Sequence, residues 1–308
     1  MPRFDVMLFG SACCDLVFSG LPGLPGMGEE AWATGLDLTA GGIVNAAVAM
    51  ARLDLKVGLA AEAGTDEWSA RVLEVLRTER VMLDHVRQYP HPYPQLTVVL
   101  NQPGDRTFIS YADRRHAESF LGSLPRIAAE ADASYFHVTA LPEYAGVVAE
   151  ARKRGKTVSL DAVWDEAWLK SAELRALIRQ ADIFMPNLKE AQTITGEEEP
   201  EAALSRLAEW TPTAVVKLGE RGAIAAADGL TIRRSLAAAK PVDSTGAGDC
   251  FAAGFLYGRL AGQGLAECLD LGNRCGRRSV GRIGGYAGAP TLQQLLEERD
   301  RESRTHGA

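Results

Sequence analysis

Residues Pro241–Gly254 read PVDSTGAGDCFAAG and carry the strongest structural signal in the chain. The stretch opens with polar, turn-forming residues, and the apolar run Phe251–Leu260 follows at helical spacing. Gly246, Ala247 and Gly248 carry little or no side chain, so their backbone N–H groups can come close to a ligand. We therefore predict a loop that enters a helix, whose unpaired first-turn N–H groups attract an anion.

Asp249 follows these glycines directly, where a bound anion would arrive. A carboxylate there would repel a phosphate, so it needs a chemical role. The simplest role is a general base that takes a proton from a hydroxyl as the hydroxyl attacks a phosphoryl group. The alternative is an ordinary helix start capped by Asp243 or Ser244, and the stretch alone favours neither interpretation.

Composition limits the class of protein. The chain has 308 residues, of which 46% are apolar and 24% are charged, as in globular proteins with one large domain. The formal charge is −7 and no basic tract stands out, so we expect no nucleic-acid partner. Local groups, rather than the field of the whole protein, must then hold any phosphorylated ligand.

The N-terminus and the cysteines indicate the cellular compartment of the protein. Met1–Asp5 lacks the apolar core of a signal peptide, and no apolar stretch is long enough to span a bilayer. The five cysteines are odd in number and form no CxxC pair, which favours a reducing compartment and argues against zinc. We expect a cytoplasmic protein with no membrane partner.

Strand-like and helix-like segments alternate regularly from Ser134 onward. This alternation predicts a mostly parallel sheet with helices on both faces. Phe4–Gly10 is the expected first strand, because it is an apolar run closed by glycine. Further strands are expected at Val57–Ala61, Tyr135–Val138, Thr157–Leu160, Ile183–Met185 and Ala214–Leu218, a short hairpin at Ala223–Ala227 and Thr231–Ser235, and helices at Trp68–Arg80, Glu143–Arg154, Glu166–Arg179, Leu188–Thr195, Glu201–Trp210, Gly246–Leu260 and Leu265–Val280.

Segments outside this alternation predict a small accessory sheet. Ala31–Thr39 alternates weakly between apolar and polar residues. Gln95–Leu100 and Thr107–Tyr111 are strand-like, and the turn residues Asn101–Asp105 separate them, which predicts a hairpin. A hairpin inserted into an α/β chain suggests a lid or an oligomer interface.

Four residues near the N-terminus are candidates for binding a small ligand. Asp15 follows the first strand, in the loop region where ligands of open α/β sheets bind, although a turn aspartate is an equal alternative. Gly41 and Gly42 open an Ala-rich helix and permit close backbone approach. Asn45 lies on its first turn and can bond to a sugar hydroxyl. Close packing of the helix on a sheet would also favour these small residues.

Asn187 and Glu190 form a candidate metal pair. They follow the strand Ile183–Met185 and lie three residues apart, so they share one face of a first helical turn. Such a pair can hold hydrated Mg²⁺, which takes few protein oxygens. The alternative is a helix cap with Glu190 at the third position, as in a capping box.

Lys217 ends another predicted strand and can reach a phosphate. Gly219 and Gly222 follow it and suit a turn beneath a flat nucleotide, although glycine turns are common. Asp161 also ends a strand and is either a site residue or a helix cap. With the anion site, the base and the metal pair, these residues supply what a phosphotransferase needs.

The sequence resembles the ribokinase-like carbohydrate kinases, the phosphofructokinase-B type family. Asp243–Asp249 (DSTGAGD) is the most specific match, and Ala40–Ala47 resembles the N-terminal signature of the family. Asn187–Glu190 resembles its NxxE motif, and Val216–Gly219 with Gly222 resembles its nucleotide turn. The match runs in the right order over nearly the whole chain.

The resemblance implies a ribokinase-like α/β fold, in which residues 1–308 form a single kinase domain. Segments around 15–39 and 95–111 would form a β-lid that closes over the sugar. In relatives this lid often dimerises, so the resemblance implies a homodimer through the lid.

The resemblance also implies roles for individual residues. Asp249 would be the catalytic base, and the backbone of Gly246–Gly248 would form the anion hole. ATP and Mg²⁺ would be the cofactors, with Asn187 and Glu190 near the Mg²⁺ and phosphates. The sugar would contact Asp15, Gly41, Gly42 and Asn45; ATP would contact Lys217, Gly219, Gly222 and Asn273; and a monovalent cation such as K⁺ would contact Asp243, Thr245, Ser279, Gly284 and Gly288.

Two departures from the family pattern argue against ribose as the substrate. Cys13 stands where many ribokinase-type members have asparagine, and Thr139–Pro142 lacks an acidic residue that ribokinase offers there. Gly104–Phe108 resembles the lids of relatives that act on keto-sugars or keto-sugar acids. Arg106 is therefore a candidate for contacting a sugar carboxylate or phosphate.

These observations predict an ATP-dependent kinase that phosphorylates a primary hydroxyl of a small sugar or keto-sugar. A nucleoside kinase is the first alternative and requires aromatic contacts to a base, for which the lid offers Trp32, Phe108 and Tyr111. A non-catalytic sugar or nucleotide sensor is the second, but a sensor would not need Asp249 as a base.

Overall fold

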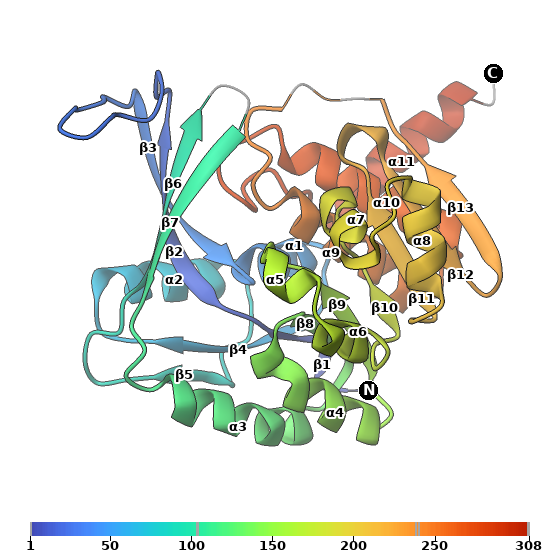
Figure 1. Cartoon of the computed structure of the whole chain (residues 1–308), viewed down its shortest axis with the longest axis horizontal. Helices are drawn as coiled ribbons and strands as arrows, with labels where there is room; N and C mark the ends of the chain where they lie inside the picture. Colours follow the sequence, from blue (N-terminus) through green and yellow to red (C-terminus); the bar gives the residue numbers. More distant parts are fainter. Residues whose placement is uncertain (1, 103–104, 238, 240, 307–308) are drawn as a thin grey trace.

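A computed structural model describes residues 2–102, 105–237, 239 and 241–306. Its largest element is a nine-stranded sheet with the order β13-β12-β11-β10-β9-β8-β1-β4-β5 (Figure 1). The strands are β1 (Phe4–Phe9), β4 (Val57–Ala63), β5 (Val86–Gln88), β8 (Ala133–Thr139), β9 (Thr157–Asp161), β10 (Ile183–Phe184), β11 (Thr213–Lys217), β12 (Ala223–Ala227) and β13 (Leu230–Arg234).

All neighbours in this sheet are parallel from β5 to β11, and β12 and β13 add an antiparallel edge. The central strands are apolar because helices cover both faces, whereas the edge strand β13 is mostly exposed. In β12, Ala223, Ala225 and Ala227 face one core while Ile224 faces the other, as the two-residue repeat of a strand requires.

Two sets of helices cover the two faces. Buried residues of α1 (Val44–Arg52), α2 (Glu67–Thr78), α9 (Ala247–Leu260) and α10 (Leu265–Ser279) belong to one core. The other core contains residues of α3 (Ala117–Glu130), α4 (Ala145–Lys153), α5 (Glu166–Leu169), α6 (Ala172–Ile178), α7 (Leu188–Thr195) and α8 (Pro200–Ala208). The last helix is α11 (Leu292–His306). None of these described helices is long and apolar enough to cross a membrane.

A separate four-stranded sheet, which we call the lid, stands beside the large sheet in the order β3-β2-β6-β7 (Figure 1). Its strands are β2 (Ala12–Ser19), β3 (Gly35–Gly42), β6 (Gln95–Gln102) and β7 (Asp105–Ala112). Phe108, Ile109 and Tyr111 on β7 are 51%, 61% and 58% exposed. Part of the lid therefore presents apolar side chains to solvent, unlike the central strands of the large sheet.

The predicted α/β sheet, the hairpin β6–β7 and the accessory sheet are confirmed. The tip of the hairpin, at Pro103 and Gly104, lies outside the described residues.

Some details of the prediction were wrong. Asp15 lies within β2 rather than in a loop, because the chain re-enters a strand at Ala12. Gly42 ends β3 instead of opening a helix, and α1 begins at Val44. The single helix expected over Glu166–Arg179 is two helices, since Ser171 caps a new one by accepting a bond from the Leu174 N–H.

Candidate active site

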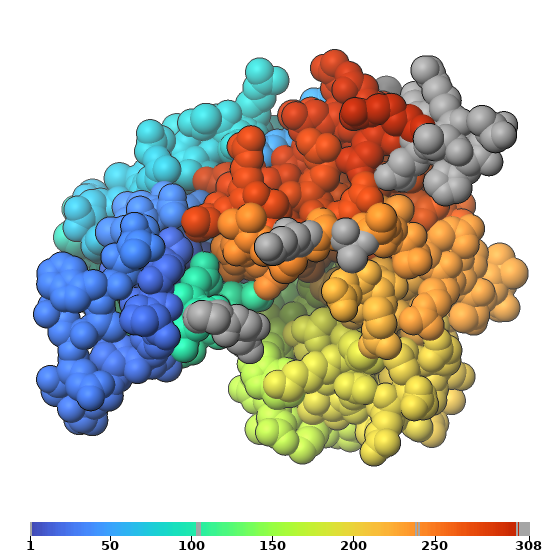
Figure 2. Space-filling view, turned by 90° about the horizontal axis from the view of Figure 1, so that it is seen from above, coloured from blue at the N-terminus to red at the C-terminus, as the bar shows by residue number. Residues whose placement is uncertain are grey.

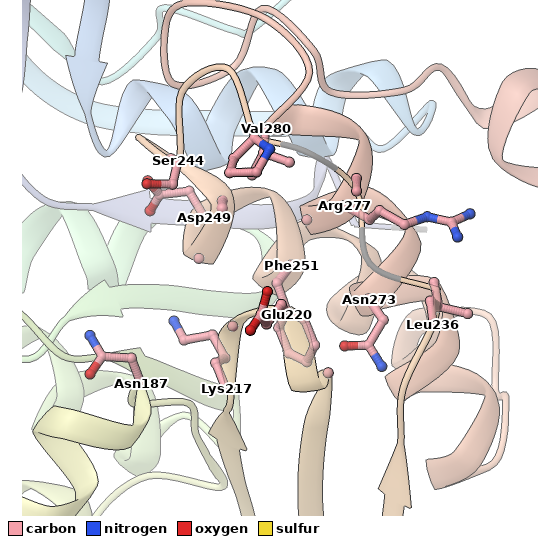
Figure 3. A pocket seen from close by; sticks show the side chains of 18 of the residues that line it. Asn187, Lys217, Glu220, Leu236, Ser244, Asp249, Phe251, Asn273, Arg277 and Val280 are labelled. Atoms are coloured by element: carbon pink, nitrogen blue, oxygen red, sulfur yellow. The ribbon is translucent and has the colours of Figure 1, made fainter. Parts of the chain in front are cut away.

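A cavity of about 550 Å³ lies at the carboxyl ends of β9 and β11, beside the start of α9 (Figure 3). Its lining includes Asp161, Asn187, Lys217, Gly248, Asp249 and Asn273. Viewed from above, the surface is hollowed between the blue lid and the yellow and orange C-terminal elements (Figure 2). The structure thus brings together residues that the sequence places far apart.

The start of α9 has the form expected of an anion hole. Gly246 is the residue before the helix, with φ +68°, and no side chain caps the first turn. A Cβ on Gly246 would lie 2.0 Å from the carbonyl oxygen of Gly285, so only glycine fits. The alternative of a capped helix is therefore wrong. Asp243 instead accepts bonds from the Thr245 and Gly284 N–H groups, at 2.9 and 3.0 Å.

Asp249 lies in the first turn of α9, facing α1. Asn45 Nδ2 donates to Asp249 Oδ2 at 3.4 Å. Burial raises the pKa of Asp249 to about 7, and the negative charge of Asp161 adds to this rise while Lys217 opposes it. A carboxyl group whose pKa lies near neutrality is suited to accept a proton from a hydroxyl.

Asn45 is buried, and its Oδ1 has no hydrogen-bond partner among the described residues. An unpaired buried oxygen is costly, so this atom is suited to accept a bond from a ligand hydroxyl. A Cβ on Gly285 would come within 2.4 Å of the same oxygen. The loop that carries Gly285 therefore packs directly against the Asn45 amide.

Asp15 lies on the lid side of the site and is buried. The Cys13 thiol donates to Asp15 Oδ1 at 3.3 Å. Burial raises the pKa of Asp15 to about 6, and this bond opposes the rise. A Cβ on Gly41 would lie 2.1 Å from the carboxylate, which explains glycine there. Cys13 thus supplies a donor to Asp15 at the position where the family resemblance leads one to expect an amide.

Asn187 and Glu190 form a capping box at the start of α7. Asn187 Oδ1 accepts from the Glu190 N–H at 2.9 Å, and Glu190 Oε2 accepts from the Asn187 N–H at 2.8 Å. Both residues also line the cavity. Burial raises the pKa of Glu190, although Lys217 opposes the rise. The helix cap is therefore confirmed, and it holds both side chains at the cavity wall, where they can bind the waters of a hydrated cation.

Lys217 extends from the end of β11 toward the start of α9 (Figure 3). Its Nζ donates to Asp161 Oδ1 at 2.7 Å and Oδ2 at 3.0 Å. Asp161 is thus a cavity residue, and Asp165 is the cap of the following helix.

Gly219, Gly222 and Asn273 line the far part of the cavity. Gly219 and Gly222 have φ of +63° and +81°, and a Cβ on Gly222 would lie 2.1 Å from the Arg234 carbonyl oxygen. Asn273 Nδ2 donates to the same carbonyl at 3.1 Å. A Cβ on Gly219 would meet nothing within 4 Å, so the turn is open at Gly219 and closely packed at Gly222.

The five residues assigned to a monovalent cation lie around one loop. Asp243, Thr245 and Ser279 are buried, and Asp243 binds the backbone of Gly284. A Cβ on Gly288 would lie 2.5 Å from the Ser279 carbonyl oxygen. The structure therefore brings these predicted residues together, and the Asp243 carboxylate accepts hydrogen bonds among them.

Arg106 connects the lid to the anion hole. It belongs to β7, yet its guanidinium donates to the Ser244 hydroxyl and it lines the same cavity. Its guanidinium also lies over the Phe108 ring, 5.7 Å from the centroid. A positive group on the lid therefore faces the cavity that holds the expected base.

A family model for the pfkB family of carbohydrate kinases matches residues 5–292. The chain belongs to this family. The family confirms the expectation of a kinase and argues against a non-catalytic sensor.

Known relatives are similar over most of the kinase. A 2-dehydro-3-deoxygluconokinase of Bacillus subtilis is 27% identical over 87% of this chain and 88% of its own length. A cytidine kinase of Thermococcus kodakarensis is 28% identical over 80% of this chain and 89% of its own length. A fructokinase of Escherichia coli is 27% identical over 84% of this chain and 91% of its own length.

Solved structures agree on the fold of the kinase. A PfkB protein from Polaromonas sp. JS666 covers 95% of this chain and 99% of its own, with a TM-score of 0.74 and 26% identity. Arabidopsis thaliana ribokinase, complexed with ribose and ATP, has a TM-score of 0.78 and 24% identity. The match covers 96% of this chain and 98% of the ribokinase chain. The expected ribokinase-like fold is confirmed.

The sequence pattern assigned no ligand role to several residues that line the cavity of the kinase, among them Phe251 and Arg277. Phe251 belongs to the apolar run of α9, so its pattern indicates only core packing. Arg277 lies in the last turn of α10 among other basic residues, where a solvated arginine is the ordinary expectation. Only the tertiary structure shows that these two residues line the cavity.

Proposed function

We propose that this kinase transfers the γ-phosphoryl group of ATP to a primary hydroxyl of a small sugar, keto-sugar or keto-sugar acid. The observation that carries the proposal is the meeting of Asp249, Asn45 and the uncapped start of α9 in one place. A hydroxyl held by Asn45 would lie beside the Asp249 carboxylate and next to an anion-binding backbone. That arrangement suits proton removal coupled to phosphoryl transfer.

In this mechanism Asp249 takes the hydroxyl proton as the oxygen attacks the γ-phosphorus and the bond to the β-phosphate oxygen breaks. The N–H groups of Gly246, Ala247 and Gly248 stabilise the charge on the transferring group. Asn187 and Glu190 would hold the waters of Mg²⁺, which when bound neutralises phosphate charge. Gly219, Gly222 and Asn273 line the part of the cavity assigned to the nucleoside of ATP.

Arg106 and two relatives support a keto-sugar or keto-sugar acid. The guanidinium of Arg106 lies at the cavity, where it can pair with a carboxylate or phosphate of the substrate. Asp15 and Asn45 supply oxygens for neutral hydroxyls. The similar proteins include a 2-dehydro-3-deoxygluconokinase and a fructokinase, whose names describe such substrates.

A nucleoside is the second candidate substrate, because one similar protein is a cytidine kinase. The three lid aromatics Trp32, Phe108 and Tyr111 are 77%, 51% and 58% exposed. The nucleobase of a nucleoside bound under the lid would have to cover some of this exposed aromatic surface.

An assay of ADP release across sugars, sugar acids, sugar phosphates and nucleosides tests the proposal. We expect turnover with one class of sugar, and loss of that turnover in Asp249→Asn while ATP binding survives. Turnover with nucleosides alone would replace the sugar by the second candidate, and near-normal turnover of Asp249→Asn would refute the role of the base.

Two further properties are part of the proposal. Asp243, Thr245, Ser279, Gly284 and Gly288 would bind a monovalent cation, so replacing K⁺ by a bulky organic cation should lower turnover. The exposed apolar residues of β7 would form a homodimer interface through the lid, and sedimentation analysis tests for the dimer.

A further inference from the structure

Asp161 has no role in the mechanism above, yet its position relates it to the chemistry. It is the last residue of β9, and Lys217 is the last residue of β11. The intervening β10 ends at Phe184, opposite Leu160 and Ala214. The ends of β9 and β11 extend past it, so their side chains can meet above it.

The Asp161–Lys217 ion pair is largely shielded from solvent. The two side chains are only 14% and 12% exposed, and Nζ approaches both carboxylate oxygens. Surface ion pairs contribute little to stability, whereas the partners of a shielded pair depend strongly on each other. Removing one partner here leaves the other without its counter-charge.

The ion pair also fixes where the ammonium lies. Nζ is 3.1 Å from the position that a Cβ would occupy on Gly248, so the ammonium lies against the first turn of α9. An ammonium has three N–H donors, and within the described part of the chain only Asp161 accepts from this one. A donor therefore remains for a phosphate oxygen bound at the start of α9.

Two other carboxylates compete for the same ammonium. Burial by itself would lower the pKa of Lys217, but the charges of Asp161, Glu190 and Asp249 outweigh burial and raise it. Without Asp161, the ammonium would be drawn toward Asp249 or Glu190. An ion pair between Lys217 and Asp249 would occupy the carboxylate that must accept the substrate proton.

We propose that Asp161 is a positioning residue for phosphoryl transfer, which holds the Lys217 ammonium against the start of α9 and away from Asp249. The proposal rests on the proposed function, because it assumes that a phosphate of ATP binds at this turn. Asp161 acts on the phosphate through Lys217, and the ammonium then shares its charge between Asp161 and the phosphate.

A double-mutant cycle tests this coupling. We expect Lys217→Met to lower kcat about 100-fold and to weaken binding of Mg·ATP about tenfold, because a charge-assisted bond to phosphate is lost. Asp161→Asn should lower kcat about 30-fold and also weaken Mg·ATP binding. The double variant should be no worse than Lys217→Met, because Asp161 has nothing to position once the ammonium is gone.

Calorimetric binding of Mg·ATP and kcat are measured for all four proteins. Effects that multiply in the double variant would overturn the proposal, as would an Asp161→Asn variant with unchanged binding and unchanged kcat. If the unmodified protein phosphorylated no compound of the panel, the proposed function would fail, but the cycle in Mg·ATP binding would still decide the role of Asp161.

A pH profile and a matched control separate positioning from support of the fold. Asp161 raises the pKa of Asp249, so Asp161→Asn should move the acid limb of kcat/KM to lower pH, whereas a merely destabilised protein would keep the limb in place. Asp165→Asn is the control, because this neighbouring aspartate caps α5 and asparagine caps equally well. Asp165→Asn should change neither the binding of Mg·ATP nor the acid limb of kcat/KM.

Discussion

The large sheet and the lid face the same cavity but are built differently. The central strands of the large sheet are covered on both faces, and groups beside the cavity are held by backbone contacts such as that of Gly246 with Gly285. The lid leaves apolar side chains of β7 in solvent and reaches the cavity through the long side chain of Arg106. Under the proposed function, this difference predicts that the large sheet determines the chemistry and that the lid determines the choice of substrate.

The comparison predicts the largest loss of turnover for the base on the large-sheet side. Asp249→Asn should lower kcat by about 10³-fold, within the range for removal of a general base, while Kd for ATP stays within threefold. Rapid-quench or coupled assays measure the loss. Asp228→Asn, in the turn after β12, is a control that should behave as the unmodified protein.

Next in size is the effect of the backbone contact under the anion hole. Gly246→Ala would place a Cβ 2.0 Å from the Gly285 carbonyl oxygen, so we expect a loss of at least about 3 kcal/mol in the free energy of unfolding. Gly262→Ala has nearly the same φ, +70°, in open space, and should cost about 1 kcal/mol. Urea unfolding compares the two; equal costs would show that the contact is unimportant.

The pH dependence of turnover reports on Asp249. The base must be ionised, and its pKa is raised to about 7, so kcat/KM should fall tenfold for each pH unit below about 7. The same shift means that Asp249 adds to stability at low pH and that this contribution is lost as pH rises through about 7. Asp249→Asn should therefore unfold at a higher temperature than the unmodified protein at pH 8, and a lower melting temperature there would contradict the assignment.

Arg106→Gln changes a side chain of the lid and none of the large sheet, so it should affect substrate binding more than the chemical step. For an anionic sugar we expect KM to rise about tenfold, since a charged hydrogen bond is lost, with kcat changed less than threefold. A neutral sugar should be nearly unaffected. Equal effects on both substrates would mean that Arg106 supports closure of the lid and not recognition of charge.

The smallest effect is expected on the exposed face of the lid. Ile109→Ser replaces a side chain that is 61% exposed, so the free energy of unfolding of the protomer should change by about 0.5 kcal/mol or less. Analytical ultracentrifugation of the same variant should show weakened dimerisation. A loss of several kcal/mol in a monomeric protein would mean that this face packs against the chain itself.

The sequence predicted the elements of the large sheet better than those of the lid. Strands covered on both faces are unbroken apolar runs, so Ile183–Met185 or Ala223–Ala227 could be recognised without tertiary information. The lid strand β3 was misplaced, because its Gly, Asp and Thr residues resemble a loop when one face is solvated. The helix α3 was missed, since Pro125 lies inside it.

In the candidate site, motifs within one segment could be predicted from the sequence, but contacts between distant segments could not. The glycines around Ala247 and the pair Asn187 and Glu190 are local motifs. The bond of Asn45 to Asp249 and the ion pair of Asp161 with Lys217 join side chains from distant segments, so their geometry depends on the assembled fold. No single-segment pattern contains them.

The contact of Gly285 with Asn45 has a consequence for synthesis of the chain. Strands β8 to β13 add in sequence order to one side of β1, so the large sheet can grow outward as the chain leaves the ribosome. The Asn45 amide is made early in synthesis, but Gly285, which packs against it, is made only near the end. A nascent chain would thus carry most of its large sheet and its lid before the segment that packs against Asn45 is made.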